Sequence, residues 1–507
     1  MFIRRKANAS GSFSVQVIEK RNGRYTLLRS FGSSKDESEL QAMERKASNF
    51  IQGYAGQQIL NFTESEQLSV TCTMVFDSIT EIVQNGPHLI LDPICNGIGF
   101  GMLADELLKQ LVVSRVCQPM SKLATVDYLR RYRGYDVDIN ALYRYMDKLN
   151  ENMRQKVRQV SVEHTTKILG GCIGIVFYDV TTLYFESSKE DVLRTTGFSK
   201  DGKTAETQIV LGLLVSMDGY PLSYSIFNGS QYEGRTMIPV IDDFVSRFNI
   251  RDFIVAADAG LLSRKNIELL KNGGYKFILG GRIKKESSKV TDWVLSLDKD
   301  EAKLNETTIN SDERIIVGYS SKRAVKDAHN RDKGIQRLRK AYSSGKLTKQ
   351  NINRKGYNKF LVIENDVMVN IDRAKIDEDT KWDGLKSYVT NTNMDASEVI
   401  RQYHGLWVVE RAFRISKGTL ETRPIFHFTE RRIEAHICIC FMAYKVYKEL
   451  ERILRMPGIE LSVDKVMDIA KTISTVTIKM TDGKTKQQVM LLTDEQRMLT
   501  PLIYTEL

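Results

Sequence analysis

Apolar, aromatic and β-branched residues dominate residues 174–186, GIVFYDVTTLYFE. This composition predicts a strand that is buried on at least one face. Asp179 lies in the middle of it, where a carboxylate is costly unless it is paired, hydrogen-bonded or bound to a cation. Two interpretations stay open at this point: a structural aspartate that is partnered by Thr181 or Thr182, or a functional one.

The residues that follow predict four more strands and two helices. Strands are expected at 208–216, 222–227, 253–257 and 275–280, and helices at about 235–248 and 263–272. Ser263 or Asn266 would open the second helix and Gly273–Gly274 would end it. The order β-β-β-α-β-α-β predicts an antiparallel meander followed by parallel pairing, and therefore a mixed sheet.

The chain before this sheet is mainly helical in pattern. Residues 12–32 predict a hairpin around the turn Asn22–Gly23, and apolar residues then recur at helical spacing from Asp36 to about His164. Asn96–Gly101 lacks the spacing of a phosphate loop and is expected to be a turn. Two short arginine-bearing helices, one of them capped by Asp138, fit either a helix-turn-helix DNA reader or an ordinary bundle.

After the sheet, the alternation of predicted strands and helices breaks off at about residue 284. Residues 284–395 are strongly charged and predict an inserted subdomain, whose basic stretch 321–350 could follow a DNA backbone or form a solvated helix face. One helix is then expected from about Asp395. It carries a single stripe, formed by Tyr403, Trp407, Glu410, Arg414 and Lys417. A salt-bridge ladder between Glu410 and Arg414 is the alternative explanation of that stripe.

The C-terminal part contains a core helix at about 433–454 and a small appendage. His427 and His436 are expected to be packed or hydrogen-bonded histidines, not metal ligands. The expected domains are 1–60, a hairpin and helix; 61–169, helical and a candidate DNA-binding region; 170–283 with 396–455, the catalytic core; 284–395, the insertion; and 456–507, the appendage.

Composition narrows the class of protein. The 507 residues include 74 Lys plus Arg against 63 Asp plus Glu, a net charge of +11, which is compatible with a polyanionic partner. Six cysteines are too few for a disulfide scaffold, so reduced core cysteines and a cytoplasmic location are expected. The N-terminus lacks the apolar core of a signal peptide. No apolar run is long enough to predict a membrane-spanning segment.

Three carboxylates have compatible positions in this pattern. Asp179 is on the first strand, Asp258 ends the fourth, and Glu410 is on a helix that could pack across both. Carboxylates without Cys or His suit Mg²⁺ or Mn²⁺, and two such ions serve phosphodiester chemistry.

The chain resembles the DDE transposases of bacterial insertion sequences, within them the insertion-sequence-4 group and most closely the insertion-sequence-1634 type. The motifs that carry the resemblance are FYDVTTLYFES at 177–187, GFSKDGKTAETQIVLGLLVSMDGYPL at 197–222, AADAGLLS at 256–263 and YHGLWVVERAFRISKGTLETRPIFH at 403–427. The resemblance implies an α/β fold: a ribonuclease-H-like mixed-sheet core with a β-rich insertion and a mainly helical N-terminal region. It also implies that Asp179, Asp258 and Glu410 form the catalytic, metal-binding triad.

On the helix expected from about Asp395, the group's signature is Tyr, Arg, Glu and Lys at fixed spacing. Tyr403, Glu410 and Lys417 match it, whereas Leu406 stands at the Arg position. Arg414, one turn beyond Glu410, could take over the phosphate contact of that Arg. Related transposases stack a tryptophan of the insertion on a flipped base, and Trp293 is the candidate here, with simple packing as the alternative.

These inferences predict a DNA transposase that cuts at mobile-element ends and transfers the freed strand into target DNA. Tyr403, Arg414, Lys417 and Trp293 would contact DNA, and two Mg²⁺ or Mn²⁺ ions would be the cofactors. Double-stranded DNA is the expected partner, with a homodimer in the synaptic complex and a nucleoid-associated, cytoplasmic location. A non-catalytic, domesticated DNA-binding protein and a simple metal-dependent nuclease are the alternatives.

Overall fold

The computed structural model describes residues 1–21, 23–54, 73–103, 106–199, 202–250, 252–344, 356–364, 368–456, 458–480 and 482–504. They form two compact units. One contains Met1–Glu81 with Thr477–Gln487, and the other contains Ile82–Val476 with Gln488–Leu507. The domain boundaries expected from the sequence stay a prediction.

The N-terminal unit pairs a small sheet with one helix. Strands β1 (Phe2–Ala7), β2 (Phe13–Arg21) and β3 (Arg24–Ser34) are antiparallel in that order, and α1 spans Glu37–Tyr54. Val15 and Val17 of β2 are fully buried and pack with Leu40 and Ala47 of α1, because alternate residues of a strand share one face. The predicted hairpin is confirmed as β2–β3, although Asn22 of its turn lies outside the described residues. The sequence pattern missed β1.

Five α-helices lie within residues 86–168 and confirm the helical prediction for that stretch, whereas residues 79–83, which the same prediction covered, form a strand. They are α3 (Gly86–Ile98), α4 (Glu106–Cys117), α5 (Lys122–Arg133), α6 (Ile139–Lys148) and α7 (Glu151–Ile168). Asp138 caps α6 as predicted, by accepting a hydrogen bond from the backbone of Ala141 at 3.0 Å. The expected turn at Asn96–Gly101 is a helix end in which Gly99 adopts the left-handed conformation, followed by a short 3₁₀ turn at Phe100–Met102.

The central sheet has the predicted element order. Its elements are β5 (Ile175–Tyr184), β6 (Gln208–Ser216), β7 (Pro221–Asn228), α8 (Met237–Phe248), β8 (Ile254–Ala257), α9 (Arg264–Asn272) and β9 (Lys276–Gly280). β5, β6 and β7 pair antiparallel, whereas β8 pairs parallel with both β5 and β9. The spatial order β7-β6-β5-β8-β9 is that of a ribonuclease-H-like core.

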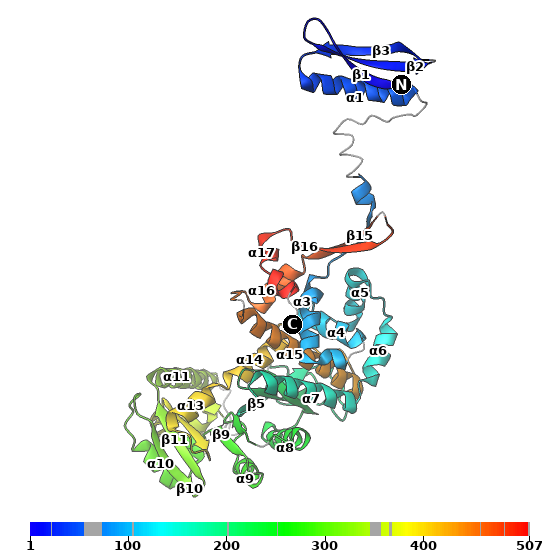
Figure 1. Ribbon diagram of the computed structural model, residues 1–507. Helices are drawn as coiled ribbons and strands as arrows, with labels where there is room; N and C mark the ends of the chain where they lie inside the picture. The colour runs from blue at the N-terminus through cyan, green and yellow to red at the C-terminus, as the bar shows by residue number, and fades with distance from the viewer. Residues whose placement is uncertain are drawn as a thin grey trace. The chain divides into compact units, whose positions relative to one another are not determined.

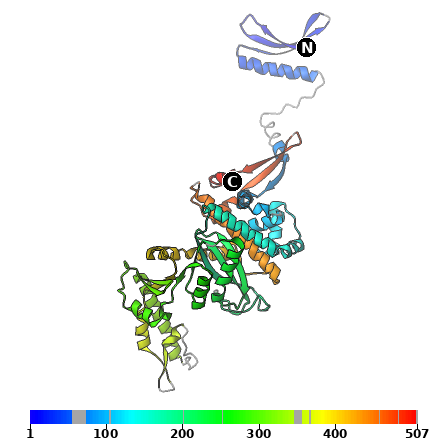
Figure 2. The same cartoon turned by 60° about the horizontal axis from the view of Figure 1, so that its bottom comes forward.

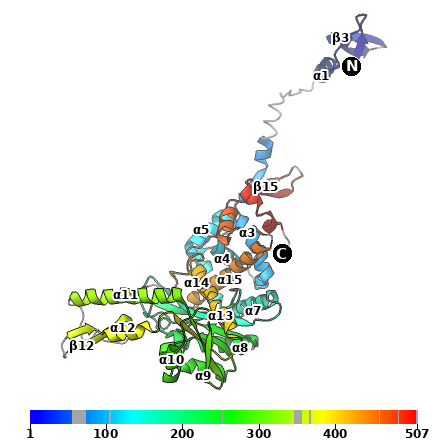
Figure 3. The ribbon, with the colours of Figure 1, turned by 90° about the vertical axis from the view of Figure 1, so that its left-hand side faces the viewer.

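Residues 284–395 extend this sheet. The segment contains 3₁₀ turns at Ile283–Lys285 and Gly356–Phe360 together with α10 (Ser288–Leu295), β10 (Asn305–Asn310), β11 (Glu313–Tyr319), α11 (Ser321–Ser343), β12 (Leu361–Glu364), β13 (Met368–Ile371), α12 (Arg373–Thr380) and β14 (Leu385–Thr390). β14 pairs antiparallel with β9 and carries β11 and β10 beyond it, which makes an eight-stranded sheet. Helix α11 lies beside the β12–β13 hairpin and α12 (Figure 3).

Helices cover both faces of the sheet. One face packs against α8, α9 and α10, and the other packs against α13 (Ala396–His404), α14 (Trp407–Lys417) and α15 (Glu430–Arg455). Helix α15 is buried along most of its length, as predicted, and runs beside the helices of residues 86–168 (Figures 1 and 2).

The C-terminal segment contains α16 (Val463–Ala470), β15 (Ser474–Lys479), β16 (Thr485–Met490) and the short helices α17 (Asp494–Arg497) and α18 (Thr500–Ile503). β15 and β16 form a three-stranded sheet with β4 (Ile79–Val83) in the order β16-β15-β4. Five of the six cysteines lie in the described residues, where all are unpaired thiols; Cys72 lies outside them. Four of the five are buried, as expected, whereas Cys172 is exposed and not a core residue. None of the described helices is long and apolar enough to cross a membrane.

Candidate active site

Asp179 and Asp258 lie at matching positions on neighbouring parallel strands. β5 and β8 pair from Ile175 with Ile254 to Tyr178 with Ala257, so each aspartate directly follows the last registered pair. Side chains alternate along a strand, which places Asp179 on the same face as Phe177, the face covered by α13, α14 and α15. Asp179 is half-buried and its Oδ1 accepts a hydrogen bond from the Val180 backbone at 2.8 Å.

Asp258 is exposed just beyond the end of β8. One side chain binds its carboxylate and another binds the backbone of the turn that follows. The hydroxyl of Tyr403, on α13, donates a hydrogen bond to its Oδ1 at 2.9 Å. Arg282 donates to the carbonyl oxygens of the next two residues, Ala259 at 2.6 Å and Gly260 at 2.8 Å, and so fixes the turn that carries the carboxylate. Gly280 of β9 leaves the space for the phenol, because a Cβ there would lie 2.4 Å from the Tyr403 oxygen.

Glu410 reaches the same face of the sheet on α14. Val409 and Phe413 of this helix are buried against the core under β5 and β6, whereas Glu410 is exposed. The single helix predicted from Asp395 is wrong: α13 ends at His404 and α14 begins at Trp407. Gly405 lies at the break and allows the chain to approach β5 closely, since a Cβ there would lie 2.4 Å from the ring of Phe177.

Lys386 of β14 is a site residue that the sequence analysis missed. Its ammonium lies 4.7 Å from the ring centre of Tyr403 and is attracted by the carboxylates of both Asp258 and Glu410. Burial is the main cause that lowers its pKa, with the nearby Arg323 adding to it, while the two carboxylates oppose the shift. No local pattern marks this lysine, because it comes from a strand inside the insertion and reaches the site only through the pairing of β14 with β9.

The three carboxylates share a face without closing into a metal-binding cluster. Across the described ranges, no three Asp, Glu, His or Cys side chains are gathered closely enough to hold a metal ion. Asp258 is engaged by Tyr403, and Lys386 interacts electrostatically with both Asp258 and Glu410. Like charges repel strongly at short range, so carboxylates on one face need a cation before they can be brought close together.

Comparison with known proteins gives the family. Residues 170–445, more than half of the chain, match the family model of the transposase DDE domain. The chain belongs to this family of transposases. Among solved structures, the piggyBac transposase synaptic complex with hairpin DNA is similar with 10% identity, a TM-score of 0.39 and 79% of each chain covered. The Mos1 transposase paired-end complex with the left transposon end has 11% identity, a TM-score of 0.16 and coverage of 34% of this chain and 58% of that one. No curated protein matches significantly.

The DNA-contact residues predicted for this transposase have different surroundings. Tyr403 is buried at Asp258, and its pKa is raised by burial and by that carboxylate, so the phenol keeps its proton. Arg414 is exposed and Lys417 half-buried at the end of α14, whereas Leu406, which replaces the signature arginine, is a core residue. Trp293, on α10, is partly buried and packs against the core on that face of the sheet. A DNA contact by any of these residues stays a prediction.

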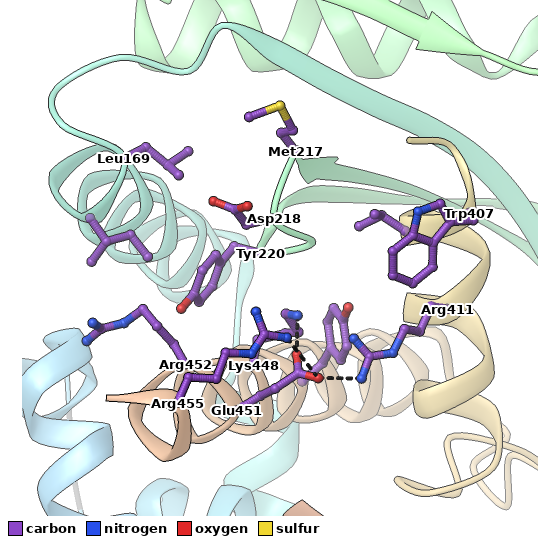
Figure 4. A pocket seen from close by; sticks show the side chains of 13 residues that line it. Leu169, Met217, Asp218, Tyr220, Trp407, Arg411, Lys448, Glu451, Arg452 and Arg455 are labelled. Carbon is purple, nitrogen blue, oxygen red and sulfur yellow. Dashed lines mark hydrogen bonds and ion pairs between the residues drawn. The ribbon is translucent and has the colours of Figure 1, made fainter. Parts of the chain in front are cut away.

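The transposase also has a basic pocket that the sequence did not predict. Its cavity of about 330 Å³ lies between the β6–β7 turn, the start of α14 and the end of α15 (Figure 4). Glu451 forms ion pairs with Arg411 and Lys448, and the exposed Trp407 stands at one side. Arg452 and Arg455 also line the cavity, so its cations outnumber its acids.

Proposed function

We propose that this transposase cuts phosphodiester bonds at the ends of a mobile element and joins the freed 3′ ends to target DNA, with Asp179, Asp258 and Glu410 as the catalytic carboxylates. We further propose that it is of the insertion-sequence-4 group and the insertion-sequence-1634 type, acts as a homodimer on two element ends, and works in the cytoplasm on nucleoid DNA. The observation that carries the proposal is the register of β5 and β8, which sets Asp179 beside Asp258 under the helix that bears Glu410.

The donor set fits a hard divalent cation. All three candidate ligands are carboxylates on one face of the sheet, and oxygen-only donors suit Mg²⁺ or Mn²⁺. A pair of such ions, when bound, would activate the attacking oxygen and stabilise the leaving oxygen. Asp179 and Asp258 would hold both ions, and Glu410 would complete one of the two sites.

The remaining residues of the site would position these groups and the DNA. Tyr403 orients the Asp258 carboxylate through its hydrogen bond, and Arg282 fixes the turn behind it. Lys386 offsets the charge of Asp258 and Glu410 in the absence of cations and would face a DNA phosphate when they are bound. Arg414, exposed one turn beyond Glu410, would contact a phosphate, since positively charged side chains position the DNA backbone.

Carboxamide variants test the assignment. Asp179→Asn, Asp258→Asn and Glu410→Gln should each lower Mg²⁺-dependent cleavage of element-end DNA by at least about 100-fold while DNA binding stays near wild type, because a metal ligand is lost without a change of shape. Asp252→Asn is the matched control, since Asp252 is an exposed carboxylate at the opposite end of β8. Cleavage at the wild-type rate by any one of the three variants would remove that residue from the site.

A strand-transfer assay separates the three candidate functions. Labelled element ends are incubated with a plasmid target and Mg²⁺, and joined product is expected. Cleavage without joining would instead indicate a nuclease. Specific binding of the ends with neither reaction would indicate a non-catalytic DNA-binding protein.

A further inference from the structure

A second basic cavity lies apart from the three carboxylates. It has a volume of about 100 Å³ and is enclosed by the end of α4, the start of α5, the segment of residues 421–427 between α14 and α15, and α15 itself. Its charged and titratable lining consists of Arg115, Lys122, Tyr143, Glu421, Arg423, His427 and His436. Glu421 is the one carboxylate that lines the cavity, and it is exposed to solvent.

Two buried cations in this cavity have no counter-charge. Arg115 is 6% exposed and Lys122 is 5% exposed. Within the described part of the chain, neither side chain has a carboxylate at ion-pair distance or a hydrogen-bond acceptor. Burying an ionised group without a partner is costly, so such a pair of cations requires an explanation.

The other buried lysines and arginines of the described chain all have partners. Arg154 and Arg158 pair with Glu151, and Arg331 pairs with Asp383. The same holds for the rest of the set: Arg194 with Asp191, Lys448 with Glu451, and Lys445 with Ser161 and Thr165. Arg115 and Lys122 are therefore exceptions to a rule that this protein otherwise follows.

The surroundings of the two cations favour an anion from several sides. Helix α5 begins beside the cavity, with Ser121 as its cap and Lys122 in its first turn, and the first backbone N–H groups of a helix carry partial positive charge. The two imidazoles stay neutral: burial, Lys122 and Arg115 lower the pKa of His427 to about 3 and that of His436 well below its usual range. Burial and Arg115 likewise lower the pKa of Lys122 to about 7, which an incoming anion would reverse.

We propose that this cavity binds a phosphate group between Arg115 and Lys122 at the N-terminus of α5. A guanidinium can donate two parallel hydrogen bonds to phosphate oxygens, and the ammonium and the helix start supply donors from other directions. A tetrahedral oxyanion, with oxygens pointing to several sides, matches donors spread over α4 and α5. The phosphate can be free inorganic phosphate or a phosphodiester of bound DNA. The proposal does not depend on the catalytic carboxylates.

Calorimetric titration of the full-length protein with inorganic phosphate, at constant ionic strength set by chloride, tests the site. We expect one phosphate per chain, and at least about tenfold weaker binding in Lys122→Met and in Arg115→Gln, because each loses a charge-assisted contact. Lys109→Met is the matched control: it removes one positive charge from α4, but Lys109 is ion-paired with Glu106 at 2.8 Å. Its phosphate affinity should stay within about twofold of wild type.

A thermal scan in phosphate-free buffer separates lost binding from lost folding. Lys122→Met should melt no lower than wild type, since the variant removes an unpaired buried charge. Phosphate should raise the melting temperature of the wild type and of Lys109→Met, and should leave that of Lys122→Met unchanged.

DNA binding at several salt concentrations identifies the source of the phosphate. If the cavity holds a backbone phosphate, the slope of log affinity against log salt for element-end DNA should fall by about one in Lys122→Met relative to Lys109→Met. If the slope is equal in the two variants while inorganic phosphate binds, the site serves a free phosphate. The proposal is overturned if wild type binds no phosphate and the slopes are equal, or if Lys122→Met and Arg115→Gln bind phosphate as wild type does.

Discussion

Replacing Tyr403 by phenylalanine removes a single hydroxyl group from the carboxylate of Asp258. That hydroxyl donates to Asp258 Oδ1 at 2.9 Å, and the tyrosine is 6% exposed. Burial and the nearby carboxylate raise its pKa, so the phenol is a donor throughout the neutral pH range. The substitution therefore tests whether an oriented Asp258 matters for activity.

The cost to stability should be small. A hydrogen bond to a charged group contributes about 1.5–3 kcal/mol, and the value here should lie near or below the lower end because water can replace the hydroxyl at the exposed Asp258. Phenylalanine keeps the ring contact with Tyr388, whose centre is 4.8 Å away. A loss of about 1 kcal/mol in the free energy of unfolding, measured by urea denaturation, is expected.

The cost to activity should be larger than the cost to stability. Groups that orient metal ligands typically contribute about 10–100-fold to metal affinity or activity. Tyr403→Phe should therefore lower the rate of element-end cleavage by about 10–100-fold and raise the Mg²⁺ concentration for half-maximal rate, as measured by cleavage against a Mg²⁺ titration.

Tyr388→Phe is the matched control for Tyr403→Phe. Tyr388 belongs to the same aromatic contact, but its hydroxyl lies 3.5 Å from His404 Nε2. Its Mg²⁺ dependence should be that of wild type. If Tyr403→Phe shows unchanged Mg²⁺ dependence, or the same defect as Tyr388→Phe, the orienting role of Tyr403 is wrong.

Three further perturbations follow from the structure. Gly405→Ala would place a Cβ 2.4 Å from the Phe177 ring, so we expect a loss of about 1–3 kcal/mol in urea denaturation; an unchanged midpoint would contradict the close approach at the α13–α14 break. Lys386→Met removes a cation that would compete with Mg²⁺ for the carboxylates of Asp258 and Glu410. The Mg²⁺ concentration for half-maximal cleavage should therefore fall by about 2–10-fold. A rise would contradict that competition. Burial and the nearby cations lower the pKa of His427 to about 3 in the folded protein, below its value in the unfolded chain. Between about pH 6.5 and pH 3 the unfolded chain therefore binds a proton at His427 that the folded protein does not. The free energy of unfolding should fall as the pH is lowered through this range, by up to about 1.4 kcal/mol per pH unit. Comparing urea denaturation at pH 7 and pH 5 in phosphate-free buffer, His427→Gln should lose less stability than wild type, and an equal loss would refute this assignment.

Local sequence signals predicted the central elements of this protein well. The β-branched and aromatic run of β5, the short apolar run of β8, and the caps at Asp138 and Ser263 each act within a few residues. The two-residue period of side chains along a strand, and a polar side chain that caps its own helix, can both be recognised from the local residue pattern. The mixed sheet, with Asp179 within β5 and Asp258 just after β8, could therefore be anticipated.

Contacts between distant segments could not be anticipated in the same way. The pairing of β14 with β9 joins the insertion to the main sheet and delivers Lys386 to Asp258, and no local period records which strand edge a segment will meet. The helical spacing continued past the break between α13 and α14, where Gly405 packs closely against the ring of Phe177, more than 200 residues earlier in the chain.

The sequence alone determined which residues can ionise and which strands and helices carry them, because those properties depend on residue type and short-range pattern. The tertiary structure decided which charges meet. Asp179 and Asp258 reach matching positions through strand register, whereas Arg115 and Lys122 line one cavity without a counter-ion because the end of α4 and the start of α5 both border it. Electrostatic energy depends on distance and burial, and both are set only when the chain is folded.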